Sequence, residues 1–155
     1  ALGPSAPPIE RPPVNSTLAR DIGILVARLG IGIIFLVHGL QKLNVWGYEG
    51  TKAGFEGMGA PIPAVTAFVA TWVEVLGGLA LILGVLVPVF GVLLFLVMAG
   101  AFFIAHVDNG VYAADGGFEL VTALGLGALL LAVVGAGAFS VDRFLAPKIP
   151  LLRAA

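Results

Sequence analysis

The sequence has 155 residues, of which 59% are hydrophobic and 11% are charged, with eight basic and nine acidic side chains. Soluble domains carry about 25% charged residues, so this composition excludes a water-soluble globular domain and a disordered chain. The formal net charge of −1 excludes a nucleic-acid binder that works by bulk electrostatics. The absence of Cys excludes disulfides, thiolate nucleophiles and Cys-ligated metals. The remaining class is an integral membrane protein.

Residues 1–17 are rich in proline and contain no long apolar run. Proline favours an extended, polyproline-like backbone, so this composition predicts an extended N-terminal arm. We expect the arm to lie along a partner protein, with contacts made by Pro4, Pro7, Pro8, Pro12 and Pro13. The arm ends at Asn15-Ser16-Thr17, whose side chains can cap a following helix.

Four apolar stretches follow, each close to the roughly 20 residues that cross the hydrocarbon core of a bilayer as a helix. They cover residues 22–41, 62–87, 89–106 and 118–139. None alternates with a period of two, which disfavours a membrane β-barrel. Short connections favour an all-α, antiparallel four-transmembrane-helix bundle within residues 18–143, followed by a tail at 144–155.

Glycine and proline mark the predicted connections. The glycines and prolines from Gly47 to Pro63 predict a break between the first two spans. Pro88 predicts a tight turn, because proline fits the first turn of the helix that follows. The segment from Asp108 to Gly117 is rich in turn-forming residues and separates the last two spans.

The basic residues predict the orientation in the membrane. Four crossings place both termini on the same side as Pro88. That side carries five basic residues, Arg11, Arg20, Arg143, Lys148 and Arg153, whereas the opposite loops carry only Lys42 and Lys52. By the positive-inside rule, we expect a multi-pass protein of the bacterial plasma membrane with cytoplasmic termini.

Two charged residues lie well inside the predicted spans, Arg28 and Glu74. A charge near the bilayer centre costs about 2.5–3.5 kcal/mol, so each needs a partner or a role. Counted at 1.5 Å per residue from the predicted span ends, their depths differ by roughly 10 Å, which a long guanidinium arm can bridge. We therefore expect an Arg28–Glu74 ion pair that fixes the helix register. The alternatives are a proton or quinone-headgroup site, and a protonated Glu74 held by hydrogen bonds.

A second polar group gathers at the outer ends of the predicted spans. Its members are His38, Gln41, Lys42, His106, Asp108 and Glu119. The first three share one helix face, because they are spaced i, i+3 and i+4. Interfacial hydrogen bonding is the simplest interpretation, and a quinone pocket or proton relay is the functional one. Metal binding by His38, His106 and Glu119, or a bis-His haem, are further alternatives, although we expect no metal site.

Several motifs occur in order along the chain: His38-Gly-x-x-Lys42-Leu43, Met58-Gly-x-Pro-x-Pro63 and Val73-Glu-x-x-Gly-Gly78, with Gly117-Phe118-Glu119 and a final Ser140-Val141-Asp142. Together they resemble the DoxX family of four-helix bacterial membrane proteins over residues 18–143. The family pattern covers Arg28, His38, Lys42, Glu74, Gly77, Gly78, His106 and Glu119. The family is named after the small subunit of a thiosulfate:quinone oxidoreductase, so the resemblance implies a link to quinone-dependent redox membranes.

We therefore expect an accessory membrane subunit that stabilises or assembles a larger respiratory-type oxidoreductase complex. Such a subunit would contact other membrane subunits and the bilayer and would not be catalytic alone. The alternative is a small membrane subunit of a quinone-reducing, thiosulfate:quinone type enzyme. A small transporter that uses Glu74 as a carrier site is a second alternative. We expect no cofactor in this chain itself, with a quinone bound nearby in the quinone-reducing alternative.

Overall fold

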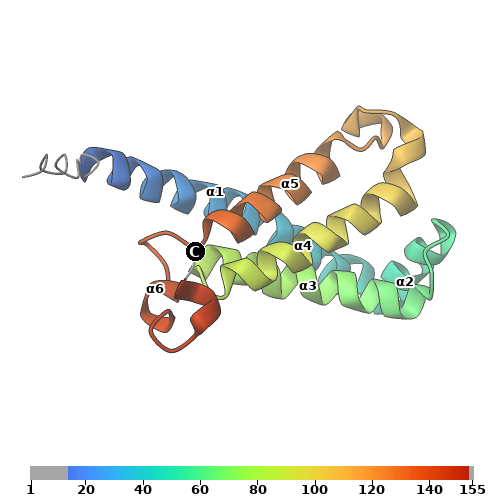
Figure 1. Ribbon diagram of the computed structural model, residues 1–155. Coiled ribbons are helices and arrows are strands. Elements are labelled where there is room, and N and C mark those ends of the chain that lie inside the picture. Colours follow the sequence, from blue (N-terminus) through green and yellow to red (C-terminus); the bar gives the residue numbers. More distant parts are fainter. Residues whose placement is uncertain (1–13, 154–155) are drawn as a thin grey trace, which may run out of the picture.

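The computed structural model describes residues 14–153, which form helices joined by short connections, with no strand in that range (Figure 1). Within these described residues, three helical stretches are long and apolar enough to span a membrane: Thr17–Gly57, Pro63–Leu83 and Val87–Asn109. The prolines that we assigned to an N-terminal arm lie outside the described residues. The chain is therefore an all-helical membrane protein with several apolar helices.

The first stretch is longer than the sequence predicted. It comprises α1 (Val14–Leu40), a π-helical segment η1 (Gln41–Trp46) and α2 (Gly47–Gly57). Residues 14–17 thus belong to a helix and not to an extended arm. The glycine-rich run of α2, expected to break the chain, is helical because each helical glycine costs only about 1 kcal/mol. The Thr51 hydroxyl also donates to the carbonyls of Lys42 and Gly47. The chain departs from helical geometry at Gly47, whose φ is 67°, and the helix ends later, with positive φ at Gly59 and Ile62.

The second and third stretches are α3 (Pro63–Leu83) and α4 (Val87–Ala101). Each has a proline in its first turn, as expected for Pro88. Helix α3 ends earlier than predicted because Gly84 and Leu86 both take the left-handed conformation, with φ of 70° and 48°. Helix α4 continues into a second π-helical segment, η2 (Phe102–His106), and then η3 (Val107–Asn109).

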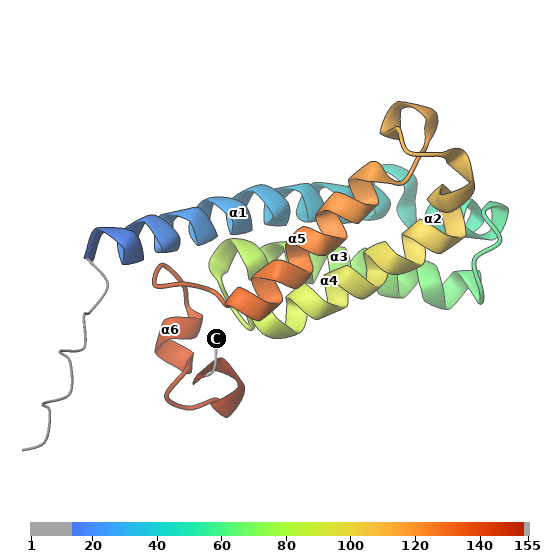
Figure 2. The ribbon, with the colours of Figure 1, turned by 45° about the horizontal axis from the view of Figure 1, so that its top comes forward.

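After η4 (Ala113–Asp115), the last long helix is α5 (Glu119–Val134). Its 16 residues are fewer than the roughly 20 that span a bilayer, and it ends at Val134, five residues before the predicted limit. The chain then turns back through α6 (Asp142–Leu145) and η5 (Pro150–Arg153). This C-terminal segment lies beside the turn between α3 and α4 (Figure 2). Leu152 is buried, so the segment packs against the rest of the molecule.

The long helices α1, α3, α4 and α5 lie alongside one another, with α1 packed on α3, α3 on α4 and α4 on α5 (Figures 1 and 2). Glycine residues allow the closest approaches between the backbones of neighbouring helices. A Cβ atom at Gly78 would lie 2.6 Å from the backbone nitrogen of Leu36, and one at Gly91 would lie 2.6 Å from the Ala128 carbonyl oxygen. Small residues let helix backbones approach in lipid, and these contacts fix the register of each pair.

Candidate functional site

A cavity of about 510 Å³ lies at the α2 end of the molecule, between α1, α3, α4 and α5. Its walls are mainly apolar and aromatic, with contributions from Phe35, Trp46, Phe55, Met58, Leu96, Met98, Ile104 and Leu124. The ionisable side chains that reach it are His38, Lys42, Glu74 and His106. An apolar pocket with a few convergent polar groups is the usual form of a small-molecule site.

Lys42 and Glu74 form an ion pair at the wall of this cavity. The Lys42 Nζ atom lies 2.6 Å from Glu74 Oε2, and the two side chains are only 11% and 5% exposed. A distance this short is typical of a charge-assisted hydrogen bond. Glu74 also interacts electrostatically with His38. The carboxylate in α3 is thus matched by cationic or polar groups from the end of α1 and from η1.

Both π-helical segments contribute to the cavity wall. Segment η1 provides Lys42 and Trp46, and segment η2 provides Ile104, Ala105 and His106. Short π-helical turns are rare and occur frequently at functional sites, because the extra residue in the turn re-aims the side chains. The local backbone on two sides of the cavity therefore departs from the regular helix that the apolar pattern predicts.

The structure brings together only part of the predicted outer cluster. His38, Lys42 and His106 line the cavity, whereas Gln41, Asp108 and Glu119 do not. His106 Nδ1 is 2.6 Å from the Gly116 carbonyl oxygen, and the Ala113 N–H donates to Glu119 Oε1 at 2.8 Å. These two contacts hold the loop before α5. Across residues 14–153 no three His, Asp or Glu side chains gather to hold a metal ion, so His38, His106 and Glu119 do not form a metal site there.

The predicted ion pair between Arg28 and Glu74 is wrong, because each residue has different partners. The buried Arg28 guanidinium donates to four backbone carbonyls, those of Leu81, Ile82, Ala136 and Phe139. The register of α1 on α3 explains the separation. Gly39 faces Val75, so Glu74 lies opposite about residue 40 of α1. At 1.5 Å per residue, that position is about 18 Å from Arg28 along the helix.

Asp142 is a buried charge whose role the sequence did not reveal. Its carboxylate accepts the N–H groups of Leu86 and Val87 at 2.6 and 2.9 Å, which caps the start of α4. Its own N–H donates to the Gly84 carbonyl oxygen at 2.8 Å. The available signal was its place in the final family-like motif, directly after the last apolar stretch. We call Arg28, Asp142 and the backbone groups that they bind the charged anchor.

Comparison with known proteins gives one family and several relatives. The family model named DoxX matches residues 23–107. Inner membrane protein YphA of Escherichia coli is 30% identical over 81% of this chain and 91% of its own length. Inner membrane protein YqjF of the same organism is 34% identical over 83% of this chain and 95% of its own length. A Bacillus subtilis protein named putative oxidoreductase CatD is 40% identical over 52% of this chain and 58% of its own length. No solved structure matches at a comparable level.

Proposed function

Because this chain belongs to the DoxX family of membrane proteins, we propose that it is a membrane subunit of a larger bacterial redox complex and holds a quinone headgroup in the α2-end cavity. The observation that carries the proposal is the buried Lys42–Glu74 pair at the wall of an otherwise apolar cavity. The relative named putative oxidoreductase CatD supports a redox role. The two relatives named inner membrane proteins support a place in the bacterial plasma membrane.

The residues of the cavity fit a quinone. Its volume of about 510 Å³ falls within the roughly 300–1,000 Å³ of small-molecule sites. The apolar walls suit the ring and the first part of a lipid tail. The Lys42 ammonium can donate a hydrogen bond to a carbonyl oxygen, and the Glu74 carboxylate can accept one from a hydroxyl. A bound quinone would supply two-electron, two-proton chemistry, with the electron donor on another subunit.

Within this proposal, the membrane topology is the one that the sequence predicts. Helix α5 serves as the fourth span of an antiparallel bundle, and both termini face the cytoplasm. The N-terminal prolines dock on a neighbouring subunit and help to assemble a respiratory-type complex. In this proposed topology the cavity lies at the outer face of the membrane and the charged anchor at the inner face.

Tryptophan fluorescence offers a direct binding test, since Trp46 lines the cavity and the chain has one other tryptophan, Trp72. In a Trp72→Phe background, Trp46 becomes the single reporter. A decyl-substituted benzoquinone should quench it saturably, because quinones quench a nearby indole. A decyl-substituted benzene without carbonyl oxygens should not. Replacing Lys42 by Met or Glu74 by Gln should weaken the apparent affinity about tenfold, which corresponds to one lost charge-assisted hydrogen bond of about 1.5–3 kcal/mol.

Lys52→Met is the matched control, because Lys52 is more exposed than Lys42 and pairs with Glu49 at 3.7 Å, away from the cavity lining. It should leave the quenching curve unchanged. Equal quenching of the Lys42, Glu74 and Lys52 variants would overturn the quinone site. If Glu74→Gln left quinone reduction by the purified complex intact while removal of residues 1–13 dispersed the complex, the chain would be a purely accessory subunit.

A further inference from the structure

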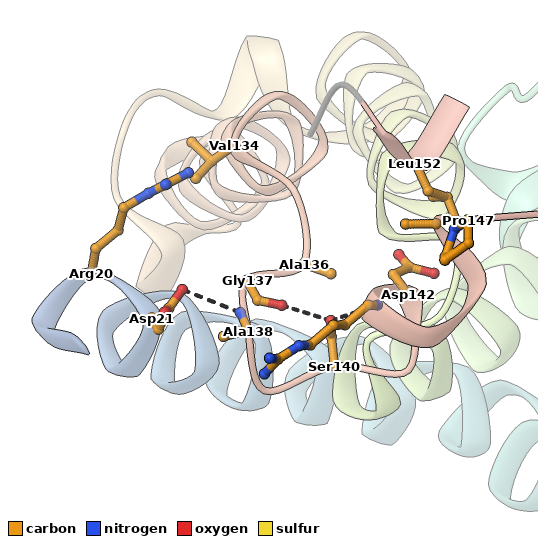
Figure 3. A pocket seen from close by; sticks show the side chains of 12 residues that line it. Arg20, Asp21, Val134, Ala136, Gly137, Ala138, Ser140, Asp142, Pro147 and Leu152 are labelled. Atoms are coloured by element: carbon orange, nitrogen blue, oxygen red, sulfur yellow. Dashed lines mark hydrogen bonds between the residues drawn. The ribbon is translucent and has the colours of Figure 1, made fainter. Parts of the chain in front are cut away.

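A second cavity, of about 590 Å³, lies at the opposite end of the molecule. Figure 3 shows the side chains that line it. We call it the terminal pocket. It is bounded by the start of α1, the chain that follows α5, and the C-terminal segment from α6 to η5. Arg20 and Asp21 approach it from α1, Ser140 from the connecting chain, and Asp142 and Arg143 from α6. Four ionisable side chains therefore surround a space that the α2-end site does not involve.

Both acidic groups of the terminal pocket are already engaged by the backbone. Asp142 accepts the N–H groups of Leu86 and Val87, and Asp21 Oδ1 accepts the Ala138 N–H at 3.2 Å (Figure 3). The nearby Arg28 interacts electrostatically with Asp142 and donates its hydrogen bonds to backbone carbonyl oxygens. With Arg20 and Arg143, the region holds three guanidinium groups against two carboxylates. The uncommitted charge at the pocket is thus positive.

Arg20 and Arg143 carry that uncommitted charge. Both residues are exposed, and within residues 14–153 neither side chain has a hydrogen bond or ion pair. Each guanidinium offers five N–H donors in a planar fork, which matches the oxygens of a phosphate group. The pocket therefore presents two free phosphate-binding side chains from two different parts of the chain.

The terminal pocket lies near one end of the first apolar stretch, where we expect lipid headgroups. Arg20 is three residues after Thr17, where the first apolar stretch begins, and about 12 Å from the buried Arg28 along α1. Next to Arg143, the aromatic side chains of Phe139 and Phe144 are 48% and 77% exposed. Exposed rings beside basic residues are typical of segments that lie in the membrane interface. A lipid phosphate would thus reach the arginines while its acyl chains contact the rings.

We propose that the terminal pocket binds the phosphate group of an anionic phospholipid through Arg20 and Arg143. The binding ties the C-terminal segment to the start of α1 across the lipid headgroup. It requires no quinone and no partner subunit, so it stands apart from the proposed redox function. A soluble phosphate is the other source of the same chemistry, and the experiment separates the two.

Thermal unfolding of the full chain in vesicles tests the proposal. A ligand that binds only the folded state raises the Tm, so vesicles of phosphatidylglycerol should raise the Tm by a few degrees over vesicles of phosphatidylcholine. High salt should reduce the difference, because it screens exposed charges. The double variant Arg20→Gln/Arg143→Gln should lose the difference. Lys148→Gln, which removes an exposed cation of the same segment that does not line the pocket, should keep it.

Three results would overturn the proposal. The first is an equal Tm in both kinds of vesicle for the wild-type chain. The second is a Tm difference that the double variant retains in full. The third is a rise of the same size when inorganic phosphate is added to phosphatidylcholine vesicles, because the pocket would then take a soluble anion. Native mass spectrometry should agree with the expected result, showing co-purified phosphatidylglycerol on the wild type and Lys148→Gln but not on the double variant.

Discussion

The two ends of the molecule both bury charged side chains, but they satisfy them differently. In the charged anchor, Arg28 and Asp142 bind backbone carbonyl and N–H groups of the α3–α4 turn and of the chain after α5. At the α2 end, Lys42 and Glu74 satisfy each other at the wall of a cavity. A charge held by the backbone supports the fold, whereas a pair of side chains can exchange its partner for a ligand. Burial of a charge alone therefore does not mark a binding site.

The largest expected effect comes from breaking the charged anchor. Arg28→Leu leaves the carbonyls of Leu81, Ile82, Ala136 and Phe139 without their side-chain donor and removes a cation that interacts with Asp142. Loss of one partner from a buried charged network costs about 3–5 kcal/mol. The free energy of unfolding, measured by denaturant titration in detergent, should fall by that amount. Lys148→Gln, at an exposed position outside the charged anchor, should change it little. Equal stability of Arg28→Leu and wild type would contradict the anchor.

An intermediate effect is expected from a change in the close contact between α1 and α3, which sets the register of these two helices. A Cβ atom at Gly32 would lie 2.9 Å from the Gly78 carbonyl oxygen, whereas one at Gly30, on the same helix, would have nothing within 4 Å. Gly32→Ala should therefore push α1 away from α3 and lower the free energy of unfolding by about 1–3 kcal/mol. Gly30→Ala should be neutral or slightly stabilising, since alanine favours the helix. Thermal unfolding of the two variants side by side checks this, and equal Tm values would count against the close approach.

The smallest effect on stability is expected when the Lys42–Glu74 pair is replaced as a whole. Lys42→Met alone leaves a buried carboxylate without its partner and should cost several kcal/mol. The double variant Lys42→Met/Glu74→Leu should stay within about 1 kcal/mol of the wild type, because apolar replacement of a buried ion pair is often neutral. A double-mutant cycle on unfolding free energies measures the coupling. A double variant less stable than either single one would mean that the pair supports the fold as Arg28 does.

Much of the architecture could be predicted from hydropathy and from proline. The apolar stretches gave the positions of α3 and α4 to within a few residues, and Pro88 marked the first turn of α4. The helical state of residues 47–57 could not be predicted, because their glycine content suggests a break. In the structure, hydrogen bonds such as those from the Thr51 hydroxyl to backbone carbonyls stabilise this helix. The early end of α5 at Val134 could not be predicted either, because apolar residues continue past the end of the helix.

The candidate site was harder to predict than the fold, because it depends on helix register. Depth counted from one end of each span placed Arg28 beside Glu74. The register is instead fixed by glycine contacts such as Gly39 against Val75, which periodicity does not reveal. Glu74 therefore pairs with Lys42, which the sequence analysis had grouped with the outer polar cluster. Asp142 was missed because its partners are backbone N–H groups, which no side-chain pattern indicates.

The carbonyl contacts of Arg28 also have a mechanical consequence. They clamp the last turn of α3 and the chain leaving α5 to α1, while Asp142 clamps the start of α4. A body clamped at one end can open only at the other, by rotation about the clamp. A small rotation of α4 and α5 there grows, with distance along the helices, into a larger displacement at the α2 end. We therefore expect the mouth of the α2-end cavity to widen when α4 and α5 move, while the clamped end stays closed.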